Sequence, residues 1–329
     1  MSETFLVVGE ALTDCAIRGD VVNETPGGSP LNVAIGIGRL GHDVLLAARV
    51  GPDARGQAII DHAVGSTVQL IDKVSGLART STAIATIADD GSASYEFDLL
   101  WDITADMVPS RDVTHVHTGS IGATLEPGGS SVVEIVRSLR TAGSSVSYDP
   151  NARPSIMGEP ADVLPRVEQL VALSHVVKAS DEDIAWLYPD KSLDEVVELW
   201  MALGASLVVV TRGAEGVVAR VGNHSVSRPT SATHVEDTIG AGDSFMSGLL
   251  VALHRSGFLG SEVSRLSGMT REELLEAVDL RWSVRRLPCR GLERNRQLNL
   301  ISTPGDKCDG AKCEHRPARE MATEAPSIR

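Results

Sequence analysis

From residue 113 onwards the chain alternates between short apolar runs and longer amphipathic stretches, and this alternation constrains the fold more than any other feature of the sequence. Each apolar run has the length of a buried strand, and each stretch after it has the apolar spacing of a helix. Strands and helices in alternation predict an α/β fold with a doubly wound, mostly parallel sheet flanked by helices. The predicted strands end at residues 117–119, 148–151, 178–180 and 211–213.

The N-terminal part of the chain begins in the same way. Residues 5–12 read as a buried first strand, which would place Asp14 just past its end. A helix is then expected over residues 29–41, with Ser29 as its N-cap and the following proline at its first position. Asn32 would lie in the first turn of this helix.

Three glycines inside that helix match the spacing of a dinucleotide-binding loop. Gly36, Gly38 and Gly41 follow the pattern G-x-G-x-x-G, but the loop requires a strand before it and a helix after it. Here a helix precedes the glycines and residues 43–50 read as a strand. We interpret the glycines as close-packing positions, and Gly41 as the C-cap of the helix. The sequence also has no P-loop motif, which excludes the P-loop NTPases.

A second glycine-rich segment, residues 236–245, leads into an apolar stretch with helical character. Gly240 and Gly242 would therefore lie at a helix start, where free N–H groups and the helix dipole favour an anion. Asp243 would lie in the first turn. It could act as a general base that accepts a proton from a hydroxyl, or it could be an acid that stabilises the helix start. The segment alone leaves both interpretations open.

Polar residues gather where the predicted strands end. In open α/β sheets this edge is where ligands bind. Each residue alone could be an ordinary loop or cap residue, but their joint placement beside the glycine-rich segment favours a binding site. The polar residues at this edge are Asp14, Asp149, Asn151, Arg153, Ser180, Asp183 and Thr211.

Composition and charge exclude several classes of protein. The chain has 329 residues, 42% of them hydrophobic, which is enough for a sizeable core. A net charge of −14 argues against general binding to nucleic acid or to an anionic membrane. No apolar run reaches the length of a membrane span, and the N-terminus lacks the basic start of a signal peptide. We expect a cytoplasmic protein without a disulfide framework.

Residues 80–87 and 92–97 flank an Asp90-Gly91 turn and predict a β-hairpin. Two strands with alternating polar residues fit poorly into a buried parallel sheet. We therefore expect a small β-sheet lid, formed by residues 15–26 and 76–100, that covers a binding site. The alternative is a hairpin at the edge of the main sheet.

Two segments resemble the signatures of a known family. Residues 27–34 with 39–41, and residues 237–243, look like the two signature segments of the ribokinase-like (PfkB-type) carbohydrate kinases. The resemblance extends from about residue 5 to about residue 280, and within the family it is strongest to bacterial fructokinases. The resemblance implies a kinase that uses ATP and Mg²⁺ to phosphorylate a sugar. The expected reaction is the conversion of D-fructose to fructose 6-phosphate, and K⁺ is a candidate monovalent cation.

The resemblance also implies roles for individual residues. Asp243 corresponds to the catalytic base, and Gly240, Ala241, Gly242 and Arg153 to groups around the transferring phosphoryl group. The residues that correspond to sugar-binding groups are Asp14, Gly27, Gly28 and Asn32. Those that correspond to nucleotide-binding groups are Asn151, Lys178, Thr211, Gly213 and Gly216. Asp183 corresponds to a residue of the Mg²⁺ shell, and Asp237 to a ligand of the monovalent cation. Ser180 stands where many relatives carry an asparagine.

Other functions stay open at this point. Ribose, 2-keto-3-deoxygluconate or a nucleoside could replace fructose as the substrate. A dehydrogenase is another alternative, for which the spacing of Gly36, Gly38 and Gly41 is the only support in the sequence. A sugar or nucleotide sensor without catalytic activity is the stronger alternative. Relatives often dimerise through the lid, so a homodimer is a further expectation.

The chain after about residue 280 differs from the rest in composition. A capping box at Thr270 and Glu273 opens a helix, but arginines replace apolar residues on its continued face. Residues 281–329 contain 11 Lys or Arg against 6 Asp or Glu. This tail lacks the alanine-rich helix with which relatives continue, and residues 303–329 have the composition of a disordered segment. We expect residues 281–329 to be an atypical basic tail, with a frameshift as one cause, that weakens ATP binding more than sugar binding. Zinc binding by the cysteines of the tail is an alternative, but their spacing matches no familiar zinc-binding pattern well.

Overall fold

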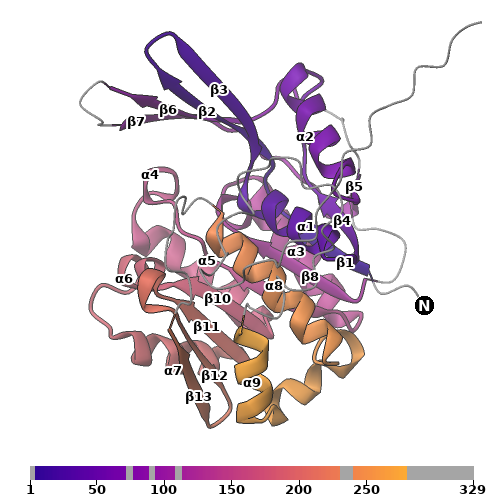
Figure 1. The fold of residues 1–329 in the computed structure, drawn as a ribbon, viewed down its shortest axis with the longest axis vertical. Coiled ribbons are helices and arrows are strands. Elements are labelled where there is room, and N and C mark those ends of the chain that lie inside the picture. Colours follow the sequence, from indigo (N-terminus) through magenta and orange to yellow (C-terminus); the bar gives the residue numbers. More distant parts are fainter. Residues whose placement is uncertain (1–3, 72–76, 89–92, 108–112, 230–239, 280–329) are drawn as a thin grey trace, which may run out of the picture.

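The computed structural model describes residues 4–71, 77–88, 93–107, 113–229 and 240–279 (Figure 1). Over these residues the chain forms a nine-stranded sheet and a separate four-stranded sheet. In the larger sheet all neighbours from β11 to β5 run parallel, and β12 and β13 extend it as antiparallel strands. Its strands, in order across the sheet, are β13 His224–Arg228, β12 Val217–Val221, β11 Leu207–Thr211, β10 Val176–Ser180, β9 Ser145–Asp149, β8 His115–Gly119, β1 Thr4–Val8, β4 Asp43–Ala47 and β5 Val68–Ile71.

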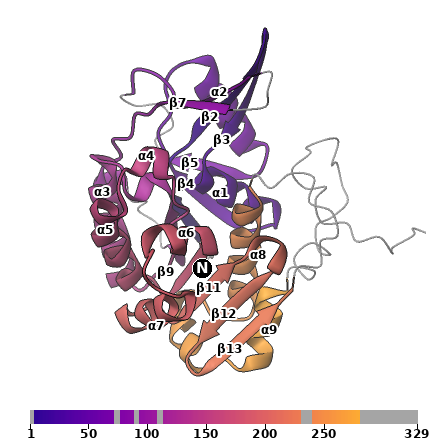
Figure 2. The ribbon, with the colours of Figure 1, turned by 90° about the vertical axis from the view of Figure 1, so that its left-hand side faces the viewer.

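Helices cover both faces of this sheet, as the alternation of the sequence predicts (Figure 2). One layer contains α1 Ser29–Arg39, α2 Ala54–Val64, α8 Ala241–Arg255 and α9 Arg271–Val278. The other contains α3 Gly128–Thr141, α5 Pro160–Leu173, α6 Asp181–Leu187 and α7 Leu193–Leu203. The remaining short helices are α4 Pro154–Met157 and the 3₁₀ segments η1 Ala105–Met107, η2 Ile121–Ala123, η3 Gly213–Glu215 and η4 Gly260–Gly268.

Alternate residues of each strand divide the core between the two layers. In β1, Phe5 and Val7 belong to the cluster beneath α1 and α8, whereas Leu6 and Val8 pack with residues of α3 on the opposite face. Because both faces are covered, all five residues of β1 are buried. The predicted fold class is confirmed.

The four-stranded sheet consists of β3 Val21–Gly27, β2 Leu12–Arg18, β6 Thr82–Ile87 and β7 Ala93–Asp98. It stands away from the main sheet at one end of the molecule (Figure 1). β6 and β7 pair antiparallel, so the predicted hairpin strands are confirmed, although the Asp90-Gly91 turn lies outside the described residues. Because β6 pairs with β2 and not with the main sheet, the alternative of an edge hairpin is wrong.

Two glycines of α1 let neighbouring segments pack closely against this helix. A methyl group added at Cα of Gly36 would lie 2.2 Å from Ser247 Oγ of α8, and one at Gly38 would lie 2.3 Å from the carbonyl oxygen of Ser66. The interpretation of these glycines as packing positions therefore agrees with the structure. The expected C-cap is wrong by one residue: Leu40 is the C-cap, and Gly41, with φ of 86°, follows it in the left-handed conformation that glycine adopts without strain.

The described part of the chain ends shortly after α9. This helix begins with the predicted capping box, in which Thr270 and Glu273 bond each other's backbone N–H groups. The expectations for residues 281–329 lie outside the described residues, and so does Asp237. The described helices include none that is long and apolar enough to span a membrane.

Candidate active site

The start of α8 lies at the centre of the candidate site. Gly240 is its N-cap, with φ of 76°, a left-handed conformation that glycine adopts without strain. The helix begins at Ala241 and continues for 15 residues, so the N–H groups of its first turn point away from the helix without intrahelical acceptors. The predicted placement of Gly240, Ala241 and Gly242 at a helix start is correct.

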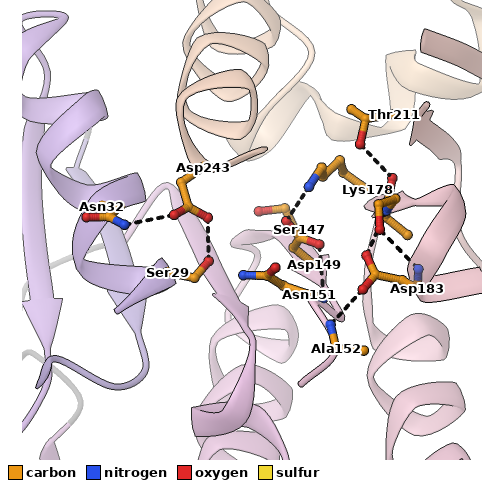
Figure 3. A network of polar contacts seen from close by, with 12 residues as sticks. Ser29, Asn32, Ser147, Asp149, Asn151, Ala152, Lys178, Asp183, Thr211 and Asp243 are labelled. Carbon is orange, nitrogen blue, oxygen red and sulfur yellow. Dashed lines mark hydrogen bonds and ion pairs between the residues drawn. The ribbon is translucent and has the colours of Figure 1, made fainter. Parts of the chain in front are cut away.

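Asp243 is held by two side chains of α1 (Figure 3). Ser29 Oγ donates to Asp243 Oδ1 at 2.6 Å, and Asn32 Nδ2 donates to Asp243 Oδ2 at 2.9 Å. Asp243 is 7% exposed, and its two carboxylate oxygens are oriented by residues more than 200 positions away in the chain. A carboxylate that only stabilised a helix start would not need such partners.

The expected N-cap of α1 was wrong. Gly28, with φ of 106°, occupies the N-cap position, and Ser29 is the first residue of the helix. A serine N-cap would bond the backbone of its own helix. Here the hydroxyl of Ser29 bonds Asp243 instead, so Ser29 belongs to the candidate site, which the local sequence pattern did not reveal.

A buried ion pair lies beside the start of α8. Lys178 Nζ on β10 donates to Asp149 Oδ2 on β9 at 2.9 Å, and the two side chains are 4% and 1% exposed. Burial raises the pKa of Asp149 to about 6, against the opposing effect of Lys178. Burial alone would lower the pKa of Lys178, but Asp149 and two further carboxylates outweigh it, and the pKa is raised. The ammonium is therefore charged at neutral pH.

The ammonium is also close to the backbone of the first turn of α8. A methyl group added at Cα of Gly242 would lie only 3.0 Å from Lys178 Nζ. Glycine at this position therefore lets the helix start approach a fixed positive charge. The charge and the free N–H groups together favour an anion at this place.

The segment after β9 is held in an unusual conformation. Asn151 has φ of 38°, and its N–H donates to Asp149 Oδ1 at 3.2 Å. Arg153 Nη1 donates to Asn151 Oδ1 at 2.8 Å, and the arginine side chain is exposed. Such backbone strain is common at functional sites.

Asp183 fastens the same segment to α6. Its Oδ1 accepts from Ala152 N and its Oδ2 from Ser180 N, both at 2.7 Å, and Ser180 caps α6 as predicted. Both oxygens therefore already have a backbone donor. Within the described residues, no group of three or more His, Cys, Asp or Glu side chains is placed to hold a metal ion. The role of Asp183 in a Mg²⁺ shell stays a prediction.

Asp14 reaches the site from the small sheet. It lies within β2, not in a loop after the first strand as the sequence suggested, because β1 already ends at Val8. A methyl group added at Gly27 would lie 1.9 Å from Asp14 Oδ2, so the carboxylate lies against Gly27. The pKa of Asp14 is raised, mainly by desolvation; the charge of Arg153 lowers it and the charge of Asp243 raises it. Asp14 is therefore close enough to Arg153 and Asp243 to interact with both charges.

The residues assigned to the nucleotide lie along the same sheet edge. Thr211 is the last residue of β11, and its Oγ1 donates to the carbonyl oxygen of Ala179 on β10 at 3.3 Å. Gly213 and Gly216 flank the turn that follows, with φ of 48° and 96°. The structure thus forms two groups of hydrogen bonds at this edge, one of Asp243 with Ser29 and Asn32 and the other of Asp149 with Lys178 and Asn151 (Figure 3). Thr211 bonds only the backbone of the neighbouring strand.

Glu10 is a second residue that the sequence analysis missed. It follows β1 after one glycine, is 6% exposed, and accepts a hydrogen bond at Oε2 from Gly122 N at 2.8 Å. Burial raises its pKa from 4.5 to about 7, although the Gly122 N–H and the charge of Arg153 favour the ionised form. A single acid within the apolar run of residues 5–12 was the signal that could have revealed it.

The raised pKa of Glu10 predicts a pH-dependent contribution to stability. Because the folded state favours the protonated acid, this contribution is largest below pH 4.5 and is lost as the pH rises to about 7. We expect the free energy of unfolding of the wild type, relative to Glu10→Gln, to fall by about 3 kcal/mol over this range. Urea unfolding of both proteins at several pH values measures it. A constant difference would contradict the prediction.

Comparisons with known proteins show the family of this chain. The sequence profile of the pfkB family carbohydrate kinases matches residues 4–277. The chain belongs to this family and is a carbohydrate kinase. It is 32% identical to a fructokinase from Vibrio alginolyticus over 76% of this chain and 83% of that protein. It is 30% identical to a fructokinase from Rhizobium leguminosarum bv. trifolii, over 90% and 92% of the two chains.

Solved structures of similar fold include two fructokinases. A double mutant of the Vibrio cholerae fructokinase, crystallised with fructose, ADP and potassium ion, is 28% identical, with a TM-score of 0.72 over 85% of this chain and 89% of that one. A fructokinase from Xylella fastidiosa with bound ATP has a TM-score of 0.77 over 84% and 89% of the chains; at 24% identity it supports the fold alone.

Proposed function

We propose that this protein is a fructokinase, which transfers the γ-phosphoryl group of ATP to D-fructose and forms fructose 6-phosphate. The observation that carries the proposal is the buried Asp243 carboxylate, fixed by Ser29 and Asn32 at the start of α8. The similarity to proteins named fructokinase supports the choice of sugar. A general base beside an anion-binding helix start fits the transfer of a phosphoryl group to a hydroxyl.

In this mechanism Asp243 accepts the proton of the attacking hydroxyl. Ser29 and Asn32 keep its carboxylate in one orientation, so little reorganisation is needed when the proton moves. The N–H groups of Ala241 and Gly242 and the charge of Lys178 stabilise the negative charge that spreads over the phosphoryl oxygens. Arg153 lies on the open side of the site, where its guanidinium can contact a phosphate.

The donor is the ATP complex of Mg²⁺, in which the metal neutralises phosphate charge. Asp183 is the candidate residue beside this metal. Because Mg²⁺ is often held by one or two carboxylates together with phosphates and waters, a single acid suffices. Thr211, Gly213 and Gly216 are the proposed border of the nucleotide site, and Asp237 stays the proposed ligand of a monovalent cation such as K⁺.

The small sheet is proposed to act as a lid over the sugar. Closure of such a lid excludes water and limits hydrolysis of ATP. We also propose a homodimer through this sheet, supported by the exposure of Val21, Val22 and Tyr95, whose surfaces are 58%, 56% and 65% accessible.

A cytoplasmic location suits an enzyme that uses ATP. Residues 1–280 are proposed to be the kinase domain, with residues 281–329 as the tail that weakens ATP binding.

Asp14 is expected to bind a hydroxyl of the sugar. Replacing it with alanine removes this acceptor, and we expect the KM for fructose to rise by about 10-fold to 100-fold, with a much smaller change in the KM for ATP. Steady-state kinetics with each substrate varied in turn measures the change. Asp20→Ala is the control, because this acid lies in the same small sheet region after β2. Equal changes in both KM values would count against a sugar contact.

A panel of substrates in a coupled assay of ADP release tests the proposed function. We expect fructose to give the highest kcat/KM, with ribose, 2-keto-3-deoxygluconate and nucleosides well below it. If another member of the panel were preferred by more than about tenfold, the sugar assignment would be wrong and the kinase assignment would stand.

A further inference from the structure

Glu10 lies between the start of α1 and η2. Its backbone is enclosed on two sides. A methyl group added at Gly28 would lie 2.7 Å from the carbonyl oxygen of Glu10, and one added at Gly122 would lie 2.8 Å from its nitrogen. The start of α1 therefore packs against one side of Glu10, and η2 packs against the other.

The side chain of Glu10 holds a strained turn. Ser120 has φ of 56° and ψ of −154°, a strained conformation that is rare outside glycine. Its N–H donates to the carbonyl oxygen of Asp149 at 3.0 Å, and two residues later the N–H of Gly122 donates to Glu10 Oε2 at 2.8 Å. The turn is thus fastened at one end to β9 and at the other end to Glu10.

The charge of Glu10 is not what this position requires. Burial favours the neutral acid, and the charge of Arg153, which acts on Glu10, also acts on the carboxylate of Asp14. What the Gly122 N–H requires is an acceptor oxygen at the end of a side chain of this length. The contact depends on reach more than on ionisation.

We propose that Glu10 is a positioning residue for the sugar: its carboxyl oxygen fixes the turn of residues 120–122 against the start of α1. In this way it sets how far Arg153, on one side of the site, lies from Gly28 and Asn32 on the other side. The inference rests on the proposed sugar site, because it assigns the effect to sugar binding. Glu10 itself need not touch the substrate.

Two conservative variants separate reach from charge. Glu10→Gln keeps the length and an acceptor oxygen but removes the charge, and Glu10→Asp keeps the charge but is one methylene shorter. We expect Glu10→Gln to stay within about 3-fold of wild type in both KM values. We expect Glu10→Asp to raise the KM for the sugar by about 10-fold or more, with the KM for ATP nearly unchanged, because the buried Gly122 N–H loses its acceptor. The reverse order of the two variants, or equal changes in both KM values, would refute the proposal.

A second measurement does not depend on activity. Hydrogen exchange followed over residues 119–124 reports the protection of the Gly122 N–H. We expect exchange to be at least about 10-fold faster in Glu10→Asp and unchanged in Glu10→Gln. Glu168→Gln and Glu168→Asp, at a partly buried acid that accepts from the hydroxyl of Tyr188, serve as controls and should change neither readout. Unchanged exchange in Glu10→Asp would overturn the inference even if the protein phosphorylated no sugar, whereas inactivity of the wild type would count only against the proposed function.

Discussion

Replacing Asp243 with asparagine is expected to lower kcat by about 10²–10⁴-fold and to leave both KM values within about 3-fold of wild type. The asparagine can still accept from Ser29, and the amide of Asn32 can rotate so that its oxygen faces the new amide group. The structure around residue 243 should therefore survive. Only the ability to take a proton from the hydroxyl is lost, and this acts in the transition state.

Asp194→Asn is the matched control, because Asp194 is also an acid in the first turn of a helix, but is exposed on α7. If Asp243 only stabilised its helix start, both variants would lose a similar, small amount of stability and keep their turnover. Steady-state kinetics with unfolding curves for both proteins distinguishes the two cases. Near-normal turnover of Asp243→Asn would remove the general base from the mechanism.

Replacing Lys178 with methionine is expected to affect both stability and turnover. The variant leaves the Asp149 carboxyl buried without its partner, which typically costs about 3–5 kcal/mol. It also removes the positive charge beside Gly242, and we expect kcat to fall by about 10²–10³-fold, as for the loss of one charge-stabilising group. Urea unfolding and kinetics with ATP measure the two effects.

A double variant separates these effects. In Lys178→Met with Asp149→Asn, neither partner of this ion pair carries a charge, and the new amide oxygen can still accept from the N–H of Asn151. We expect most of the stability to return while turnover stays low. Lys191→Met, at an exposed lysine, is the control. If turnover recovered together with stability, Lys178 would be a structural residue only.

The sequence predicted the fold well because its signal was local and repeated. Apolar runs of strand length, each followed by helical spacing, recur along the chain, and the structure ends strands at Gly119, Asp149, Ser180 and Thr211, at or close to the expected places. The small sheet was also predictable from the alternating pattern of its hairpin strands.

Contacts between distant segments were not predictable in this way. Ser29 has the local features of an N-cap, and nothing near it in sequence shows that its hydroxyl bonds a residue 214 positions away. Asp14 was misplaced because residues 5–12 read as one strand, whereas the chain leaves the main sheet after Val8 and enters a second sheet at Leu12.

The burial of polar residues inside the main sheet was also not predictable from the local sequence. The alternation of polar and apolar residues in β8 and β9 is typical of half-exposed strands, yet all residues of both strands are buried. His115 and Ser147 satisfy each other, with His115 Nε2 2.7 Å from Ser147 Oγ. Only the three-dimensional pairing of the strands provides these partners.

The most direct test of the central claim is phosphoryl transfer by the full chain of 329 residues. Purified protein is incubated with ATP, Mg²⁺ and D-fructose, and fructose 6-phosphate is measured alongside ADP. We expect ADP to form at a rate that depends on fructose, with one fructose 6-phosphate for each ADP. ADP formation that is absent or independent of any sugar, in a protein that still binds fructose and ATP, would contradict the kinase mechanism and favour a sugar or nucleotide sensor.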